Sequence, residues 1–232
     1  MGKKVNSFTD VLEPLRELGW RPGAIIDIGV EMGTTGLYSV WPDVPICLIE
    51  PSPDSLPFME KIAAAYPHVS IFNVGASDRT AEVVVQKHET LVNIHFGQDK
   101  SWGETTVKVR PCDDMVEEAG LEPPFIYKLD TDSHEREILA GSNKTLANSE
   151  LCIIEINIFN PRFGYISPNE IWVAMAGHGF TFFNIANCGF GESGVMRSAD
   201  FVFVKEKSQL FKLAQKNSTK RTRLVDMTRA RL

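Results

Sequence analysis

The strongest constraint on the fold of this chain is the alternation of short apolar runs with segments of helical periodicity. The apolar runs predict buried strands at residues 24–28, 45–50, 69–74, 125–130 and 151–157, with two closing strands at 180–185 and 201–204. Helices are expected at 8–18, 54–66, from about residue 135, and at 168–176. Strands that alternate with helices predict an α/β fold, with a parallel sheet covered on both faces. Ligands bind such sheets at the carboxyl ends of the strands.

One segment, residues 81–109, interrupts the alternation. It holds strand-like pieces at 82–86 and 105–109 with a polar loop between them, and predicts an inserted hairpin beside the site. The length of 232 residues suits one α/β domain. We expect an N-terminal helix packed on the core within residues 1–20, the main domain over 21–206, and a basic tail over 207–232.

Charge is unevenly distributed along the chain. The net charge is −6, yet residues 205–232 carry nine Lys/Arg against two Asp/Glu, which leaves an acidic body. An acidic body argues against a nucleic-acid-binding surface. The tail is interpreted as solvated or partly helical, with contact to RNA, an anionic lipid or a partner as the alternative. The oligomeric state is not readable from the sequence.

No apolar run approaches the roughly 20 residues that a membrane-spanning helix needs, and no secretion signal is recognisable. The four cysteines, at positions 47, 112, 152 and 188, are scattered and form no CxxC pair. This spacing argues against a zinc site or a disulfide framework. We therefore expect a cytoplasmic protein without a membrane span.

A glycine turn follows the first strand. Asp27, Gly29, Glu31 and Gly33 lie in it, and a helix is expected to begin near Thr34. A dinucleotide-binding fingerprint needs a glycine at position 31, where a glutamate would oppose the pyrophosphate. The spacing better suits the amino-acid end of S-adenosylmethionine (SAM), whose ammonium can meet Asp27 and whose carboxylate can meet free N–H groups. The turn therefore favours SAM over NAD.

Two further segments complete the expected cofactor site. Glu50 ends the second strand, where an acid can accept hydrogen bonds from both ribose hydroxyls. After the third strand, Ala76, Ser77 and Asp78 are candidates to flank the adenine, with Asp78 accepting from its amino group. A plain turn is the alternative for this second segment.

Taken in order, these segments resemble the FkbM family of SAM-dependent methyltransferases. The similarity runs from about Gly19 to Lys205. Its motifs are residues 26–29 with Gly33, 49–51, 73–78, 127–132 continuing through 134–141, 153–155, and 200–203.

The resemblance implies a class I methyltransferase fold, a Rossmann-like three-layer sandwich with a seven-stranded, mostly parallel sheet and an antiparallel last strand. It also implies SAM as cofactor and O-methylation of a hydroxyl on a sugar, glycan or small natural product. The chain departs from the family pattern at Val30 and Glu31, where Ala-Asn is usual, and at Ser133, where glycine is frequent. A weakly active or inactive SAM-fold interaction module is therefore the alternative, with an NAD-dependent oxidoreductase further behind.

Transfer of a methyl group to a hydroxyl requires alignment of the reactants and a base for the hydroxyl proton. Asp130 and His134 follow the fourth strand and are the expected base candidates, with Asp130 also facing the cofactor. Lys128 is the third expected catalytic residue, and it needs a partner such as Asp130 or Glu155 if its strand is buried.

A magnesium-dependent mechanism is the less favoured alternative. Asp130, Glu155 and Asn157 would supply the oxygen ligands if a metal were involved. The loops at 88–102 and 159–165 are expected to face the acceptor, and their aromatic side chains suit stacking on a sugar. These aromatic residues are Phe96, Trp102, Phe159, Phe163 and Tyr165.

Overall fold

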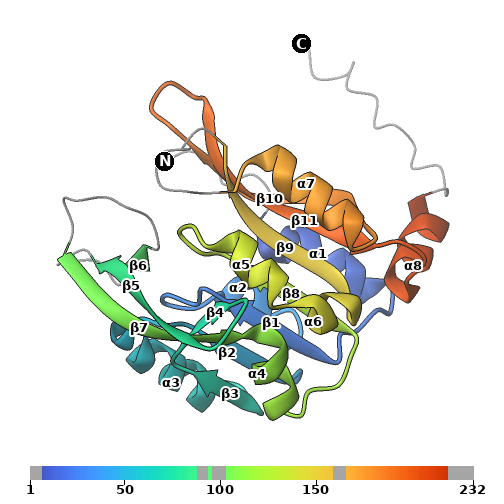
Figure 1. Ribbon diagram of the computed structural model, residues 1–232. Coiled ribbons are helices and arrows are strands. Elements are labelled where there is room, and N and C mark those ends of the chain that lie inside the picture. The colour runs from blue at the N-terminus through green and yellow to red at the C-terminus, as the bar shows by residue number, and fades with distance from the viewer. Residues whose placement is uncertain (1–6, 88–93, 96–102, 159–165, 219–232) are drawn as a thin grey trace.

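The computed structural model describes residues 7–87, 94–95, 103–158 and 166–218 (Figure 1). Within this part, a seven-stranded sheet has the order β3–β2–β1–β8–β9–β11–β10. Its strands are β1 (Ala24–Ile28), β2 (Ile46–Ile49), β3 (Val69–Phe72), β8 (Phe125–Leu129), β9 (Ser149–Asn157), β10 (Phe180–Phe190) and β11 (Met196–Lys205).

All neighbouring strands of this sheet are parallel except for β11, which runs antiparallel to both β9 and β10. The prediction of a mostly parallel seven-stranded sheet with an antiparallel last strand is therefore confirmed. All residues of β1, β2 and β8 are buried, as expected for central strands covered on both faces. The carboxyl ends of β1, β2, β8 and β9 meet at one edge of the sheet, which is where ligands bind in such folds.

Helices cover both faces of the sheet (Figure 1). One face packs against α1 (Phe8–Glu17), α2 (Thr35–Tyr38), α3 (Leu56–Ala65) and α8 (Gln209–Ser218). The other packs against α4 (Cys112–Glu118), α5 (Glu135–Ala140), α6 (Asn143–Ala147) and α7 (Pro168–Gly177). A short 3-10 turn, η1 (Pro53–Ser55), precedes α3. The result is the expected three-layer arrangement.

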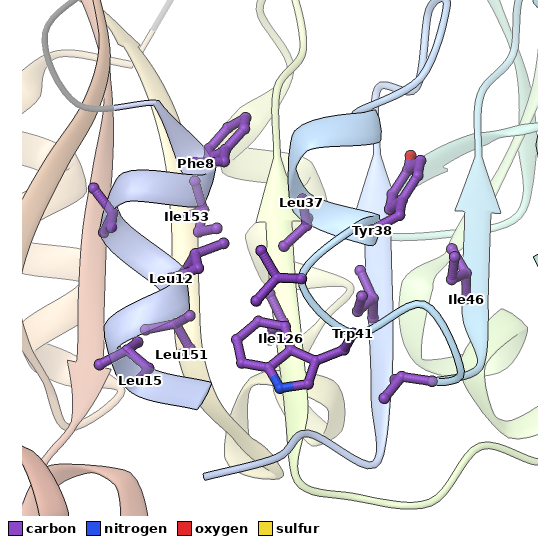
Figure 2. Packing of buried hydrophobic residues seen from close by; sticks show 14 of the residues in the cluster. Phe8, Leu12, Leu15, Leu37, Tyr38, Trp41, Ile46, Ile126, Leu151 and Ile153 are labelled. Atoms are coloured by element: carbon purple, nitrogen blue, oxygen red, sulfur yellow. The ribbon is translucent and has the colours of Figure 1, made fainter. Parts of the chain in front are cut away.

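The N-terminal helix α1 contributes directly to the core. Phe8, Leu12 and Leu15 recur at helical spacing and face the sheet and the α2 segment (Figure 2). Trp41 lies in the same cluster, close to Ile126 of β8 (Figure 2). The helix is therefore part of the hydrophobic core, which also includes Val30 of the glycine turn.

A smaller second sheet has the order β4–β7–β5–β6. It consists of β4 (Gly75–Ser77), β5 (Ala81–Lys87), β6 (Ile94–His95) and β7 (Gly103–Pro111). Antiparallel pairing of β5 with β7 confirms the inserted hairpin. The segment proposed as an adenine-flanking turn, around Ala76, is instead a short strand that pairs parallel with β7.

The start of the segment 207–232, expected as a solvated or partly helical tail, is helical. Helix α8 lies within that segment, and its Leu210 is buried in the core cluster of α1. The reason is local: Leu210 and Phe211 give the start of the basic segment an apolar side that packs on the sheet. Residues 219–232 lie outside the described part.

Over the residues that the structure describes, no helix is long and apolar enough to cross a membrane. Cys47, Cys112 and Cys152 are buried free thiols, and Cys188 is a half-buried one.

Candidate functional site

A cavity of about 420 Å³ opens at the carboxyl ends of β1, β2, β8 and β9. Its position agrees with the rule for open parallel sheets. The lining is markedly acidic: within the described part of the chain it holds five carboxylic acids and one lysine. The lining residues are Gly29, Val30, Glu31, Met32, Gly33, Thr34, Glu50, Pro51, Lys128, Asp130, Thr131, Asp132, Glu155 and Asn157.

Gly29 begins the turn after β1 and has a φ of +82°. A Cβ built at this position would lie 1.7 Å from the backbone oxygen of Asp130. The backbone N–H of Gly29 donates to Ile49 O, and that of Asp130 donates to Ile28 O. Only glycine therefore lets the turn pass between the ends of β2 and β8 and form one wall of the cavity.

Gly33 has a φ of +102°, a backbone conformation that favours glycine. A Cβ at Gly33 would also lie 2.5 Å from Cδ1 of Ile62 on α3, so a side chain here would have to displace Ile62. Glu31, between the two glycines, has a φ of 47° and faces the cavity. Burial raises the pKa of its carboxyl, with Asp130 and Asp132 adding to the effect.

Glu50 follows β2 and is almost fully buried. Its Oε1 accepts from the backbone N–H of Ser52 at 2.8 Å, and its Oε2 from that of Glu31 at 3.3 Å. Each oxygen keeps further acceptor capacity toward the cavity that it lines. Burial raises the pKa of Glu50 to about 7, against the opposing effect of these two hydrogen bonds.

Asn73 stabilises the backbone around Glu50 through two side-chain hydrogen bonds. Its Nδ2 donates to the backbone oxygens of Glu50 and Ser52 at 2.8 and 3.0 Å. Asn73 lies in one of the family motifs, in residues 73–78, but no role was predicted for it. Its position directly after β3, beside the end of the neighbouring β2, is the sequence feature that indicates a side-chain hydrogen bond to the backbone.

Asp27 is fully buried and does not line the cavity. Its Oδ1 lies 3.1 Å from Nζ of Lys128, and its Oδ2 accepts from the hydroxyl of Tyr38. The expected contact with the cofactor ammonium is therefore corrected: Asp27 faces the core of the α1 face, where Lys128 and Tyr38 occupy it. It anchors the glycine turn from within the fold.

Lys128 was expected to pair with Asp130 or Glu155, and its Nζ lies 3.1 Å from Oδ2 of Asp130. The second partner, Asp27, was missed. The two carboxylates outweigh the cost of burying the ammonium and raise the pKa of Lys128 above its ordinary value. The lysine is thus held as a cation between the core and the cavity.

Glu155 of β9 and Asp200 of β11 lie directly opposite each other in register. They share a face of the sheet with Lys128, since alternate residues point to opposite faces. Burial raises the pKa of Asp200 to about 6 and that of Glu155 to about 9. The neighbouring Asp130 carboxyl also raises the pKa of Glu155.

His134, the other base candidate, lies away from the cavity lining. Its Nε2 lies 2.9 Å from Oγ of Ser77, and its Nδ1 lies 3.5 Å from Oε2 of Glu137. The left-handed backbone at Ser133 and His134 turns the imidazole toward β4. These contacts correct the prediction of His134 as a base at the site.

The adenine-flanking candidates are also placed elsewhere in the described structure. Ala76 is buried in the core, Ser77 contacts His134, and Asp78 pairs with Arg79 at 3.0 Å. None of the three is among the residues that line the cavity. Pairing of β4 with β7 turns this segment into the second sheet.

The described residues contain no group of three or more His, Cys, Asp or Glu side chains placed to hold a metal ion. Asp130, Glu155 and Asn157 are therefore not assigned as metal ligands. The aromatic residues expected to face the acceptor, Phe96, Trp102, Phe159, Phe163 and Tyr165, lie outside the described residues.

The family model of the methyltransferase FkbM domain matches residues 42–182. Among curated proteins, hexuronic acid methyltransferase AglP of Haloferax volcanii is 24% identical over 151 residues, which cover 64% of this chain and 62% of that relative. The chain thus spans less than two thirds of the length of this relative.

Solved structures show the same fold. The crystal structure of methyltransferase FkbM from Methylobacillus flagellatus KT matches with a TM-score of 0.53 and 13% identity, covering 87% of this chain and 48% of that one. A DUF574 family protein from Streptomyces avermitilis matches with a TM-score of 0.51 and 12% identity, covering 85% and 80%. The sheet order and the antiparallel β11 are those of the class I methyltransferase fold. With more than half of its length matched by the family model, the chain belongs to the methyltransferase FkbM domain family.

Proposed function

We propose that the protein is a SAM-dependent methyltransferase that methylates a hydroxyl group on a sugar, a glycan or another small hydroxylated molecule. The observation that carries the proposal is the acidic cavity that joins the glycine turn and Glu50 to Asp130. Family membership implies SAM as the methyl donor. The name of the Haloferax relative, a hexuronic acid methyltransferase, supports a sugar as acceptor.

The residues of the cavity fit SAM better than a dinucleotide. SAM carries an ammonium and a sulfonium, whereas a dinucleotide carries a negatively charged pyrophosphate. Five acids line the cavity, and its one lysine is already bonded to Asp27 and Asp130. A pyrophosphate would meet carboxylates at close range, and no free cation among the described lining residues would balance it, which is unfavourable in a partly buried site.

In this proposal, Glu50 accepts hydrogen bonds from the two ribose hydroxyls, which its position in the cavity lining after β2 supports. The glycine turn, from Gly29 to Thr34, borders the space for the amino-acid end. Bound SAM supplies an activated methyl group on its sulfonium. The protein's own task is then to align the acceptor hydroxyl and to receive its proton.

Asp130 is the proton acceptor in this proposal. It lines the cavity directly after β8, and its carboxylate is more than one third exposed while hydrogen-bonded to Lys128. The Lys128 ammonium holds the carboxylate in place from the core side. Lys128 itself is a positioning residue, because its hydrogen bonds to Asp27 and Asp130 direct it toward the carboxylates.

The proposal is tested with SAM labelled at its methyl carbon and a panel of neutral glycosides, amino sugars and uronic acids. We expect label on a hydroxyl, which survives mild alkali because an ether resists hydrolysis, whereas a methyl ester on a uronate is lost. The Asp130→Asn variant should bind SAM and lose transfer by two or more orders of magnitude. SAM binding without transfer to any acceptor would instead support an interaction module.

A further inference from the structure

Asp130 and Glu155 form a pair of neighbouring carboxyl groups at the cavity wall. In the parallel pairing of β8 with β9, Lys128 lies opposite Ile153. Asp130 and Glu155 are each two residues further along their chains, so they lie opposite each other near the ends of these strands. Both side chains line the cavity. Two ionised carboxylates at neighbouring positions repel each other, so the pair is stabilised by one bound proton.

The surroundings explain why the proton stays on the pair. Neighbouring segments contribute further acids: Glu31 from the glycine turn, Asp132 from the loop after β8, and Asp200 from β11. Among the described residues, the cation that contacts the pair is Lys128, which is also bonded to Asp27 of β1. Burial raises the pKa of Glu155 to about 9, with further contributions from Asp130, Asp200 and Asp132. At neutral pH, the free protein therefore carries one proton on the pair.

In the proposed function, the cavity that this pair lines also holds the sulfonium of SAM, whose positive charge is lost during methyl transfer. Its volume of about 420 Å³ includes both Glu50, the proposed ribose site, and the pair. The sulfur of SAM is joined to the ribose by one carbon, so a ribose at Glu50 leaves the sulfonium in the same enclosed space. A positive charge near two carboxyl groups favours their ionised form.

We infer that the Asp130–Glu155 pair exchanges its proton with the charge on the cofactor sulfur: it releases the proton when SAM binds and regains one from the acceptor hydroxyl. This inference rests on the proposed function and adds Glu155 as a catalytic residue. The pair is then doubly ionised when the acceptor arrives, which makes it a stronger base than the single-proton pair of the free protein.

The step balances in atoms and charge. The S–CH₃ bond breaks and its electron pair stays on sulfur, which becomes a neutral thioether. The acceptor oxygen forms the new O–CH₃ bond, its O–H bond breaks, and the proton passes to a carboxylate oxygen of the pair. One positive charge disappears from sulfur as one negative charge disappears from the pair.

Calorimetry of ligand binding tests the inference without any acceptor. SAM and S-adenosylhomocysteine are titrated into the full chain at pH 7.5 in phosphate and in Tris, whose different ionisation enthalpies report the protons released. The two ligands share every titratable group, so the difference between them isolates the sulfonium. We expect SAM to release about one proton more than S-adenosylhomocysteine.

Two variants and a control locate the source of that proton. Glu155→Gln and Asp130→Asn should reduce the difference to near zero. Glu117→Gln removes an exposed carboxylate of α4 that pairs with Lys144, and should leave the difference unchanged. Circular dichroism verifies folding, and the comparison of the two ligands in the unmodified protein stands even if a variant does not fold.

The outcomes separate the two proposals. If both ligands bind and release equal numbers of protons, or if the difference persists in Glu155→Gln, the inference is wrong while the proposed function stands. If neither ligand binds at millimolar concentration, the proposed function fails and the inference fails with it.

Discussion

Lys128 on β8 and Asp27 on β1 lie directly opposite each other in the sheet and form an ion pair, 3.1 Å from Nζ to Oδ1, with neither side chain more than 2% exposed. Replacing Lys128 with Met leaves a buried carboxylate without its cation. We expect the free energy of unfolding to fall by about 3–5 kcal/mol, measured by urea denaturation at pH 7.

The double variant Asp27→Asn/Lys128→Met provides the control for that measurement. It removes both charges, so it should recover part of the stability lost in Lys128→Met. A loss below about 1 kcal/mol in the single variant would contradict the anchoring role of the pair.

The glycine turn offers a matched pair of substitutions. Gly29 and Gly120 both have positive φ, but a Cβ at Gly29 meets the Asp130 backbone, whereas at Gly120 nothing lies within 4 Å. Gly120→Ala should therefore cost only the backbone strain, about 1 kcal/mol. Gly29→Ala should cost more than about 3 kcal/mol or prevent folding, because the end of β8 must move. Equal losses in thermal denaturation would show that the close approach is not needed.

Glu50→Gln tests the proposed ribose site. The amide nitrogen cannot accept a hydrogen bond, and the loss of charge weakens those that the remaining oxygen accepts. We expect the dissociation constant for SAM in calorimetry to rise by about tenfold to a hundredfold. Asp54→Asn is the control, since Asp54 lies four residues away on η1, pairs with Lys87, and does not line the cavity. An unchanged affinity in Glu50→Gln would remove Glu50 from the site.

Stability should depend on pH through Glu155. Its pKa is raised from 4.5 to about 9 in the folded protein, so its contribution to stability is complete below about pH 4.5 and is lost as the pH rises through 9. The free energy of unfolding should fall from pH 6 to pH 9. In Glu155→Gln this fall should be smaller by about 1–3 kcal/mol, since glutamine has no proton to lose.

Part of the decrease in the free energy of unfolding between pH 6 and pH 9 should remain in Glu155→Gln. Burial raises the pKa of Glu50 and Glu135 to about 7, and both still titrate over this range. Urea denaturation at pH 6 and pH 9 measures the change in the free energy of unfolding for the unmodified protein and for Glu155→Gln. An identical dependence on pH in the two proteins would contradict the protonated state of Glu155.

Much of the fold follows from the sequence because local patterns dominate it. The run from Ala24 to Ile28 predicts β1 to the residue, since a continuous apolar run before a glycine has few alternatives in an α/β chain. The short segment at Gly75 was predicted to flank the adenine, with a plain turn as the alternative. It was not predicted as a strand, because its strand partner β7 lies far along the chain, where Gly75 pairs with Val109. Pairing at that separation leaves no local periodicity to detect.

The sequence predicts which residues of the candidate site follow the ends of strands, but it does not predict the directions in which their side chains point. Glu50 and Asp130 face the cavity as expected, because both directly follow central strands. Asp27 faces the core because alternation along β1 directs it away from Ile26 and Ile28 and toward the Lys128 side. His134 turns toward Ser77 because the backbone at Ser133 and His134 is left-handed, which no spacing rule foresees.

The most direct test of the account is a crystal structure of the protein with S-adenosylhomocysteine. We predict the ribose hydroxyls within hydrogen-bonding distance of the Glu50 carboxylate, the amino-acid end along the glycine turn from Gly29, and the sulfur on the side of Asp130 and Glu155. A ligand bound outside this cavity, or with its ribose turned away from Glu50, would contradict it.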